Sequence, residues 1–215
     1  MIPVDAILFD LDGTLIDSKR DLAQSVRYLQ RQYGAAVSSD QQVGSFIGDG
    51  VMKLIQRALP KLPEVQLDQA VTVFKNYYRE HCLDHTHVYP GVLTTLKHFR
   101  QKKIAVVTNK PVRVSGYLLD ELGISSYIEI LIGGDSLPNK KPHPEPVLSA
   151  LKTMRIRGLK RSVIVGDGPN DILAGQAAGI YTCGIKSNIG NLAELSRNKP
   201  DFIIQGMKDL MRIFN

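Results

Sequence analysis

Tryptophan is absent from the chain, and cysteine occurs only twice, at Cys82 and Cys183. The two cysteines have neither the spacing of a metal site nor that of a redox pair, so we expect both to be reduced and structural. No apolar run approaches the ~20 residues that cross a bilayer. The N-terminus lacks a basic start and a small-residue cleavage site, and Asp5, Asp10 and Asp12 interrupt its apolar stretch. We therefore expect no signal peptide, no membrane partner and a cytoplasmic protein.

Long runs of one charge are also missing. The chain carries a formal net charge of +6, yet its lysines and arginines are scattered along the sequence. This pattern is weak support for nucleic-acid binding, which we do not expect, and it suits an enzyme that attracts small anions. The remaining composition, with 43% hydrophobic and 22% charged residues in a chain of 215, is that of a globular protein.

Short apolar segments alternate with segments of helical spacing over most of the chain. The expected strands cover residues 4–9, 104–108, 128–132, 162–166, 181–185 and 202–204. The expected helices between and after them cover residues 90–99, 112–122, 146–154, 171–178 and 207–214. Strands that are apolar throughout and alternate with helices are typical of a parallel sheet covered on both faces.

Residues 17–33 and 41–82 differ, since helical spacing recurs there with no clear strand. The sequence therefore predicts an α/β fold with a doubly wound, Rossmann-like parallel sheet made of residues 1–16 and 84–215. An all-helical domain, residues 17–83, is inserted into this core.

Two acids end the first expected strand, in the motif Asp10-Leu11-Asp12-Gly13-Thr14. Asp10 and Asp12 are two residues apart and would share one face of an extended chain, while Gly13 permits a sharp turn. Such a pair suits one acid as a nucleophile and the other as a proton carrier. A solvated turn at the end of a strand is the alternative interpretation.

Donor groups follow the next strand, in Thr108-Asn109-Lys110. The hydroxyl of Thr108 and the amide of Asn109 could hold phosphoryl oxygens, although both residue types are also common helix caps. Further on, Lys140 and Lys141 precede a proline-rich turn. A lysine there could neutralise a phosphate and its attacking carboxylate, or simply belong to an exposed basic loop.

A third strand ends in Gly166-Asp167-Gly168-Pro169-Asn170-Asp171. Carboxylates four residues apart, between a strand and a helix, can hold a hard cation such as Mg²⁺. A capped turn is again the alternative. Ligands of doubly wound folds bind at the carboxyl ends of the strands, so these motifs in this order favour one shared site.

The order and the residues of these motifs resemble those of the haloacid dehalogenase superfamily over essentially the whole chain. Asp-Leu-Asp-Gly-Thr-Leu at 10–15 combined with Gly-Asp-x-x-x-Asp at 166–171 carries the resemblance, and the helical insert is similar to that family's helical cap. Within the superfamily, the sequence segments 47–50, 107–111 and 133–144 resemble those of phosphoglycolate phosphatases.

The resemblance implies a role for each motif. Asp10 attacks phosphorus and forms an aspartyl-phosphate, and Asp12 protonates the leaving alcohol and later deprotonates the attacking water. Thr108 and Asn109 bind the phosphoryl group, and Lys141, which directly precedes Pro142, pairs with it and with Asp10.

The resemblance also implies a Mg²⁺ cofactor held by Asp10, the backbone carbonyl of Asp12 and Asp167, with support from Asp171. The cap selects the substrate, and its turn Gly48-Asp49-Gly50 reaches into the site; an ordinary interhelical turn is the alternative. For a substrate that carries a carboxylate, Lys53, Arg57 and Arg20 are candidate cations.

The resulting function is a Mg²⁺-dependent phosphatase acting on a small phosphorylated metabolite, first of all 2-phosphoglycolate, as a monomer or homodimer. A pyrophosphatase, a nucleotide or sugar-phosphate phosphatase, a phosphomutase and a non-enzymatic module on the same scaffold remain alternatives. The segment Lys186-Ser-Asn-Ile-Gly190 departs from the phosphoglycolate phosphatases, which leaves the exact substrate open. Dehalogenation is disfavoured, because a halide leaves without the proton that Asp12 would supply.

Overall fold

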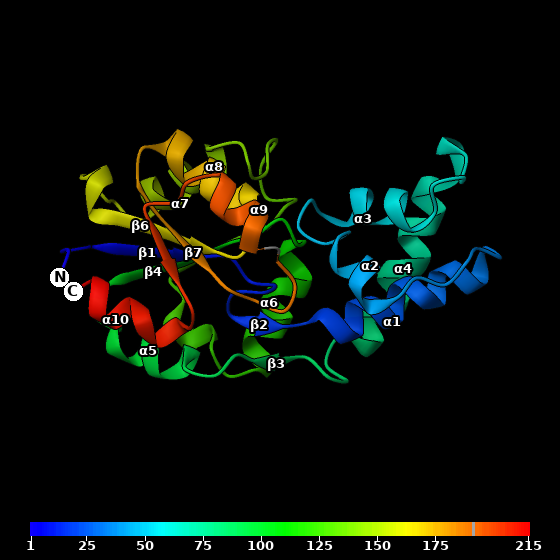
Figure 1. Ribbon diagram of the computed structural model, residues 1–215, viewed down its shortest axis with the longest axis horizontal. Helices are drawn as coiled ribbons and strands as arrows, with labels where there is room; N and C mark the ends of the chain where they lie inside the picture. The colour runs from blue at the N-terminus through cyan, green and yellow to red at the C-terminus, as the bar shows by residue number, and fades with distance from the viewer. Residues whose placement is uncertain (191) are drawn as a thin grey trace.

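The computed structural model describes residues 1–190 and 192–215. Figure 1 shows two parts side by side: one contains a central sheet and both termini, and the other is built from the helices between residues 19 and 81. We call them the sheet part and the helical part. In the described residues, no helix is long and apolar enough to cross a membrane.

A six-stranded sheet with the order β5-β4-β1-β6-β7-β8 forms the centre of the sheet part in the described residues. All neighbouring strands pair in parallel. The strands are β1 (Ala6–Phe9), β4 (Lys103–Val107), β5 (Ile130–Ile132), β6 (Ser162–Gly166), β7 (Tyr181–Ile185) and β8 (Phe202–Ile204). The chain order reverses at β1, and such a switch point is where doubly wound sheets bind ligands. The predicted doubly wound parallel sheet is therefore confirmed.

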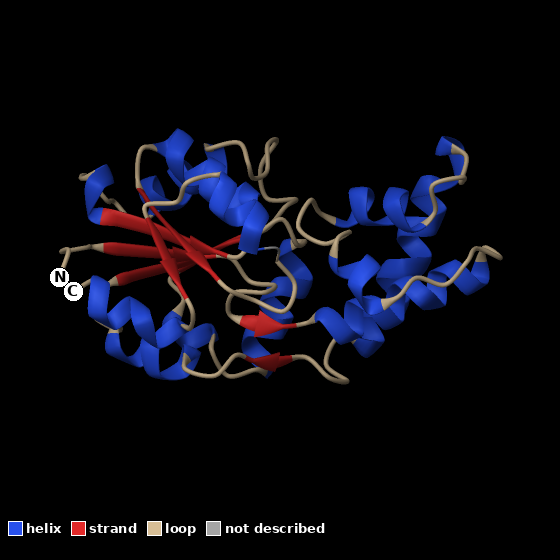
Figure 2. Ribbon diagram, viewed as in Figure 1, coloured by secondary structure: helices blue, strands red, loops and turns tan. Residues whose placement is uncertain are grey.

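Helices cover both faces of the sheet, as Figure 2 shows. Successive side chains of β1 alternate: Ile7 and Phe9 pack with one apolar core, while Ala6 and Leu8 pack with the other. The helices of this part are α5 (Val92–His98), α6 (Val112–Glu121), α7 (Glu145–Thr153), α8 (Pro169–Ala178), α9 (Leu192–Arg197) and α10 (Leu210–Ile213). Helix α8 begins two residues before the predicted start at residue 171, because proline is well suited to a first helical turn.

The helical part consists of α1 (Lys19–Gln32), α2 (Asp40–Gly44), α3 (Val51–Ala58) and α4 (Leu67–His81). Helices α1 and α4 face each other with apolar side chains such as Val26 and Phe74, which are buried in the same core. On the same pair of helices, the rings of Tyr28 and Tyr77 stack with centroids 4.0 Å apart. The expectation of helices agrees with the structure between residues 19 and 81, whereas Asp17, expected in the helical stretch, lies in the short strand β2 (Ile16–Asp17).

A short antiparallel pair was not expected from the sequence. It joins β2 (Ile16–Asp17) to β3 (His87–Val88), which lie where the chain leaves and re-enters the sheet part. Two-residue strands are too short to show the alternation of apolar and polar residues that marks a strand. Their pairing also joins segments far apart in the chain, which no local pattern predicts.

The buried side chain of Asp21 holds the segment at which the chain re-enters the sheet part. One of its carboxylate oxygens, Oδ2, accepts hydrogen bonds from the backbone N–H of His85 (3.0 Å), the backbone N–H of Thr86 (2.8 Å) and the hydroxyl of Thr86 (2.7 Å). Asp21 itself is fully buried in the first turn of α1. The helical part is thus tied to the returning chain by charge-assisted hydrogen bonds, which are stronger than neutral ones.

Replacing Asp21 by alanine is expected to lower the free energy of unfolding by about 2 kcal/mol, because buried N–H groups lose their acceptor. Urea unfolding followed by circular dichroism measures the loss. Asp68→Ala is the control, since Asp68 is exposed in the first turn of α4 and its removal is expected to change stability by about 0.5 kcal/mol or less. Equal stability of the two variants would contradict a role for Asp21.

Candidate active site

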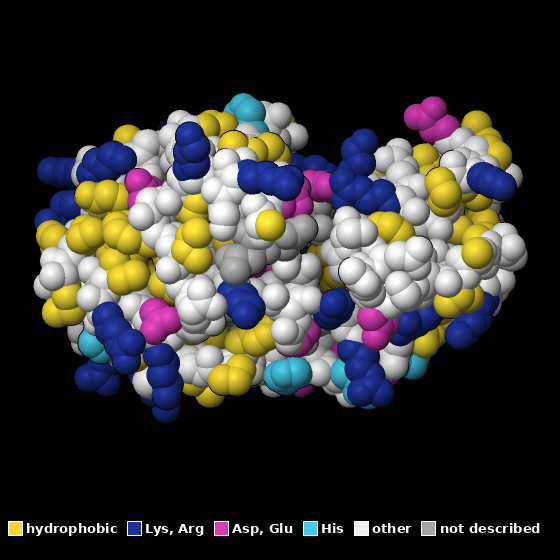
Figure 3. Space-filling model, viewed as in Figure 1, with side chains coloured by type: hydrophobic (Ala, Val, Ile, Leu, Met, Phe, Trp, Pro, Cys, Tyr) yellow, Lys and Arg dark blue, Asp and Glu magenta, His cyan; other side chains and the backbone are white. Residues whose placement is uncertain are grey.

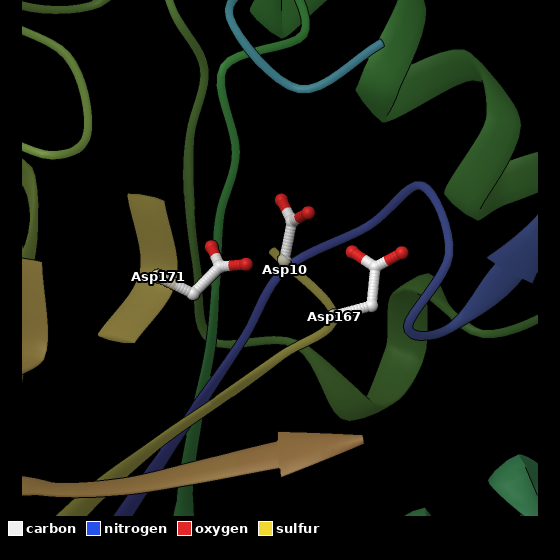
Figure 4. Close-up of side chains that lie close together, drawn as sticks. All are labelled: Asp10, Asp167 and Asp171. Carbon is white, nitrogen blue, oxygen red and sulfur yellow. The ribbon is translucent and has the colours of Figure 1, made fainter. Parts of the chain in front are cut away.

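Three carboxylates meet at the carboxyl ends of β1 and β6. Asp10 follows β1, Asp167 follows β6, and Asp171 lies in the first turn of α8. One oxygen from each of the three lies within 4.8 Å of the others. Figure 4 shows the three side chains turned to the same side of the strand ends. They meet because β1 and β6 are neighbours in parallel register, with Phe9 beside Val165.

Gly13 makes this close approach possible. Its φ of +82° lies in the left-handed region, and a Cβ atom built there would stand 2.0 Å from an oxygen of Asp167. Any other residue at this position would push against the Asp167 carboxylate and strain the turn. The glycine that the sequence suggested for a sharp turn therefore also provides space for a carboxylate.

Lys141 is the cation of this cluster. Its buried ammonium group lies 2.9 Å from Asp10 and 2.5 Å from Asp171, and it donates a hydrogen bond to the carbonyl of Val107 (2.5 Å). Burial opposes the charged form, but Asp10 and Asp171 outweigh it and raise the pKa of Lys141 above its usual value. Lys141 thus remains an ammonium ion. The neighbouring Lys140 points elsewhere and donates to the carbonyl of Asp49 (2.7 Å).

Asp167 has no lysine or arginine in ion-pair contact within the described part of the chain. Among the described residues, the side chain of Asp167 accepts one hydrogen bond, from the hydroxyl of Ser187 (2.6 Å). Burial, followed by the charges of Asp10 and Asp171, raises the pKa of Asp167 well above its usual value. Lys141 therefore neutralises Asp10 and Asp171 but not Asp167, and the oxygen donors of the three carboxylates fit a divalent cation that binds oxygen ligands.

Asp12 faces a second buried lysine, to which the sequence analysis assigned no role. The ammonium group of Lys110 lies 3.1 Å from each oxygen of Asp12 and donates to the hydroxyl oxygen of Tyr78 (2.8 Å). Ser18 donates to Oδ1 of Asp12 (2.5 Å). The position of Lys110 directly after Thr108 and Asn109 was the available signal. Tyr78 could not be found this way, because in sequence it belongs to the apolar face of α4.

Thr108 and Asn109 are buried at the end of β4. The hydroxyl of Thr108 accepts a hydrogen bond from the backbone N–H of Lys110 (3.3 Å). The side-chain amide of Asn109 donates to the carbonyls of Gly48 (2.9 Å) and Lys141 (2.8 Å). The amide donors that were expected to face a phosphoryl group therefore hold two loops together in this structure.

The turn Gly48-Asp49-Gly50 of the helical part reaches the sheet part. Asn170 donates to a side-chain oxygen of Asp49 (2.7 Å), and the other oxygen of that carboxylate pairs with Arg57. Gly50 has a φ of +86°, and a Cβ there would lie 3.3 Å from the carbonyl of Asn109. Gly50 therefore permits a close approach of the two backbones.

A cavity of about 1230 Å³ lies between the two parts. Its lining includes Asp10, Asp12, Lys110 and Asp167 from the sheet part and Tyr78 and Arg57 from the helical part. Of the three candidate cations for a carboxylate, Arg57 is among the lining residues in the described chain, whereas Arg20 and Lys53 are not. On the face drawn in Figure 3, lysine and arginine side chains are spread over both parts without forming a continuous basic field.

Comparisons with known proteins agree with this geometry. The family model for haloacid dehalogenase-like hydrolases matches residues 7–185. The phosphoglycolate phosphatase of Neisseria meningitidis is 36% identical over 96% of this chain and 92% of that protein. The phosphoglycolate phosphatase 1 of Pseudomonas aeruginosa is 34% identical over 95% of this chain and 78% of its own length. A crystal structure of a predicted phosphoglycolate phosphatase from Haemophilus somnus matches with a TM-score of 0.92 and 32% identity, covering 98% and 97% of the two chains.

Replacing Lys141 by methionine is expected to lower the free energy of unfolding by about 3 kcal/mol, because removing one partner leaves buried carboxylates unpaired. The matched control is Lys140→Met at the adjacent position, where a half-buried lysine donates to the carbonyl of Asp49. Its expected loss is about 1 kcal/mol or less. Urea unfolding in the presence of a chelator compares the two, and similar losses would argue against Lys141 as the cation of the cluster.

Proposed function

We propose that this chain, which belongs to the haloacid dehalogenase-like hydrolase family, hydrolyses 2-phosphoglycolate. The products would be glycolate and phosphate, and the reaction would require Mg²⁺. The chain is a phosphoric monoester hydrolase, in keeping with curated relatives named phosphoglycolate phosphatase that are 36% and 34% identical over nearly its whole length. The observation that carries the proposal is the Asp10 carboxylate, held by Lys141 at the strand ends and lining the cavity beside Asp12.

The proposed reaction has two steps. In the first, a carboxylate oxygen of Asp10 attacks phosphorus and the bond to the leaving oxygen breaks, while Asp12 gives that oxygen a proton. In the second, water attacks the aspartyl-phosphate at phosphorus and passes a proton to Asp12, which releases phosphate and restores Asp10. Asp12 acts first as acid and then as base, so no net proton remains on the enzyme.

Lys141 prepares the encounter of two anions. Its ammonium group contacts Asp10 directly, and a phosphoryl group on Asp10 would lie within the field of the same charge. Thr108 is buried and lines the same cavity as Asp10 and Lys141, and its hydroxyl is proposed to bind a phosphoryl oxygen. Asn109 is proposed to do the same through its amide once one of its present bonds is exchanged.

Asp10, the backbone carbonyl of Asp12 and Asp167 would hold Mg²⁺, with Asp171 supporting it. The fit rests on the donor set, which consists of oxygen ligands that Mg²⁺ prefers and brings one oxygen each of Asp10, Asp167 and Asp171 within 4.8 Å of one another. Burial, and then the charges of Asp10 and Asp171, raise the pKa of Asp167. When bound, the ion would weaken the repulsion between the carboxylate and the phosphate.

Residues 17–83 are proposed to act as a cap that excludes water and selects the substrate. Arg57 lines the cavity from this side, and it is our candidate for the carboxylate of phosphoglycolate. The turn Gly48-Asp49-Gly50 would lie against the bound substrate. We propose that the enzyme works in the cytoplasm as a monomer or homodimer on small phosphorylated metabolites, without nucleic acid or membrane partners.

A different small phosphate ester is the second candidate substrate. The segment 186–190 departs from the phosphoglycolate phosphatases in sequence, and its residues Asn188, Ile189 and Gly190 line the cavity. Ser187 of the same segment contacts Asp167. A change of sequence here could alter substrate choice while the carboxylates and Lys141 keep the same chemistry.

Phosphate release from a panel of phosphorylated metabolites with saturating Mg²⁺ tests the proposed function. We expect 2-phosphoglycolate to have the highest kcat/KM, above sugar phosphates, nucleotides and pyrophosphate. Asp10→Asn is expected to lower kcat by about 1000-fold or more, because an amide does not attack phosphorus. Asp68→Asn on the exposed face of α4 is the control. A low kcat/KM for 2-phosphoglycolate relative to the other compounds would contradict the proposed substrate. An active Asp10→Asn variant would contradict the assignment of Asp10 as the nucleophile.

Replacing Asp167 by asparagine tests the Mg²⁺ site. The pKa of this carboxyl is raised by folding, so its ionised form costs stability at neutral pH, and the variant should have a higher Tm than wild type in a chelator. Mg²⁺ at about 100 times its Kd should stabilise wild type by roughly 2.7 kcal/mol, but not the variant. Exposed Asp120, replaced by asparagine, is the control. A variant that keeps the Mg²⁺ response would contradict the assigned ligand.

A further inference from the structure

The mechanism above gives no role to the buried ammonium group of Lys110, although this group contacts Asp12. The Lys110 side chain is 5% exposed and the Asp12 side chain is 12% exposed. The ammonium group lies between both oxygens of Asp12 and the hydroxyl of Tyr78, largely out of contact with solvent. It is therefore a fixed partner of Asp12.

The contacts of Asp12 are unequal between its two oxygens. Among the described residues, Oδ1 accepts from both Ser18 (2.5 Å) and Lys110 (3.1 Å), whereas Oδ2 accepts from Lys110 alone (3.1 Å). A carboxylate oxygen has two lone-pair sites. Oδ2 is thus the oxygen with a site left for a proton, while Oδ1 is held in place by two donors.

Tyr78 connects this arrangement to the helical part. Its hydroxyl oxygen accepts from Lys110 (2.8 Å), and the Lys110 ammonium also lies 4.5 Å from the centre of its ring. Tyr78 is buried on α4 and lines the cavity. The lysine that holds Asp12 is therefore itself held by a side chain of the other part of the molecule.

A contribution to stability alone does not explain why Lys110 and Asp12 are buried together beside Tyr78. Removing a lysine and an aspartate from water costs free energy that their attraction often only offsets, and apolar residues of similar size frequently serve a core as well or better. A position where a carboxylate must keep one orientation is different, because a misplacement of about 1 Å can cost about 100-fold in rate.

We propose that Lys110 is a positioning residue for the proton transfers of Asp12, that Ser18 and Lys110 hold Oδ1 so that Oδ2 carries the proton, and that Tyr78 anchors Lys110 from the helical part. This inference rests on the proposed phosphatase mechanism. It gives the helical part a share in the chemical step, in addition to covering the site.

Two aryl phosphates distinguish positioning from a merely structural role. Phenyl phosphate and p-nitrophenyl phosphate have similar size and no carboxylate, but p-nitrophenolate leaves readily without a proton and phenolate does not. With Mg²⁺ present, Lys110→Met is expected to lower kcat/KM by about 30-fold for phenyl phosphate and about threefold for p-nitrophenyl phosphate. Lys110→Arg, which keeps two donors for the carboxylate, should stay within about threefold of wild type for both.

Further variants complete the experiment. Tyr78→Phe, which removes only the hydroxyl, should show the same selective loss at about fivefold for phenyl phosphate. Lys110→Met placed on Asp12→Asn should add no further loss, because residues that act through one group are not additive. Lys152→Met, at an exposed position on α7, is the control, and circular dichroism verifies the fold of each variant.

Equal losses for both esters, or losses that multiply in the double variant, would overturn the inference. If Lys110→Met does not fold, Tyr78→Phe serves as the test variant. An unchanged ratio of kcat/KM between phenyl phosphate and p-nitrophenyl phosphate in that variant would overturn the inference. A wild type that releases phosphate from both esters while the ratio stays unchanged in every variant refutes only the role of Lys110. A wild type that releases phosphate from neither ester and not from 2-phosphoglycolate refutes the proposed function, and the role of Lys110 with it. If 2-phosphoglycolate alone is hydrolysed, an unchanged kcat for it in Lys110→Met and Tyr78→Phe overturns the role of Lys110.

Discussion

The repulsion between carboxylates gathered at one edge of the sheet is the constraint on which the rest of the site depends. Four of them, Asp10, Asp12, Asp167 and Asp171, line one cavity. Two buried lysines divide the charge: Lys141 pairs with Asp10 and Asp171, and Lys110 pairs with Asp12. Asp167 has no lysine or arginine partner among the described residues, so its carboxylate is left for the divalent cation that we propose.

The same constraint explains how the two parts of the molecule meet. Buried charges need hydrogen-bond partners, and several of these come from residues at the junction. Ser18, at the N-cap of α1, contacts Asp12, and Tyr78 of α4 contacts Lys110. Loop contacts from Asn109 and Lys140 to the turn at 48–50 add to this junction. The helical part is therefore joined to the site by polar contacts, besides the apolar cluster that its buried side chains share with one face of the sheet.

Most of the fold could be predicted from the sequence, since apolar strands and helical spacing are local patterns. The strands at 104–108 and 162–166 were expected within a residue of β4 and β6. The pair of β2 and β3 was not, because two residues carry no periodicity. Among the site residues, Asp10 and Asp167 were named from motifs and Lys141 from the family resemblance, and the structure brings the three together. Lys110 was quoted without a role and Tyr78 passed unnoticed, since helical spacing alone makes Tyr78 a core residue.

The sequence by itself determined the sheet, the helical insert and the acids that end the strands, because each depends on residues near one another in the chain. Tertiary structure decided which lysine serves which carboxylate. Lys140 and Lys141 are adjacent, yet only Lys141 reaches Asp10. Lys110 meets Asp12 and Tyr78 from segments that are distant in sequence. Burial and charge pairing across such distances arise only when the packed chain brings the groups out of water together.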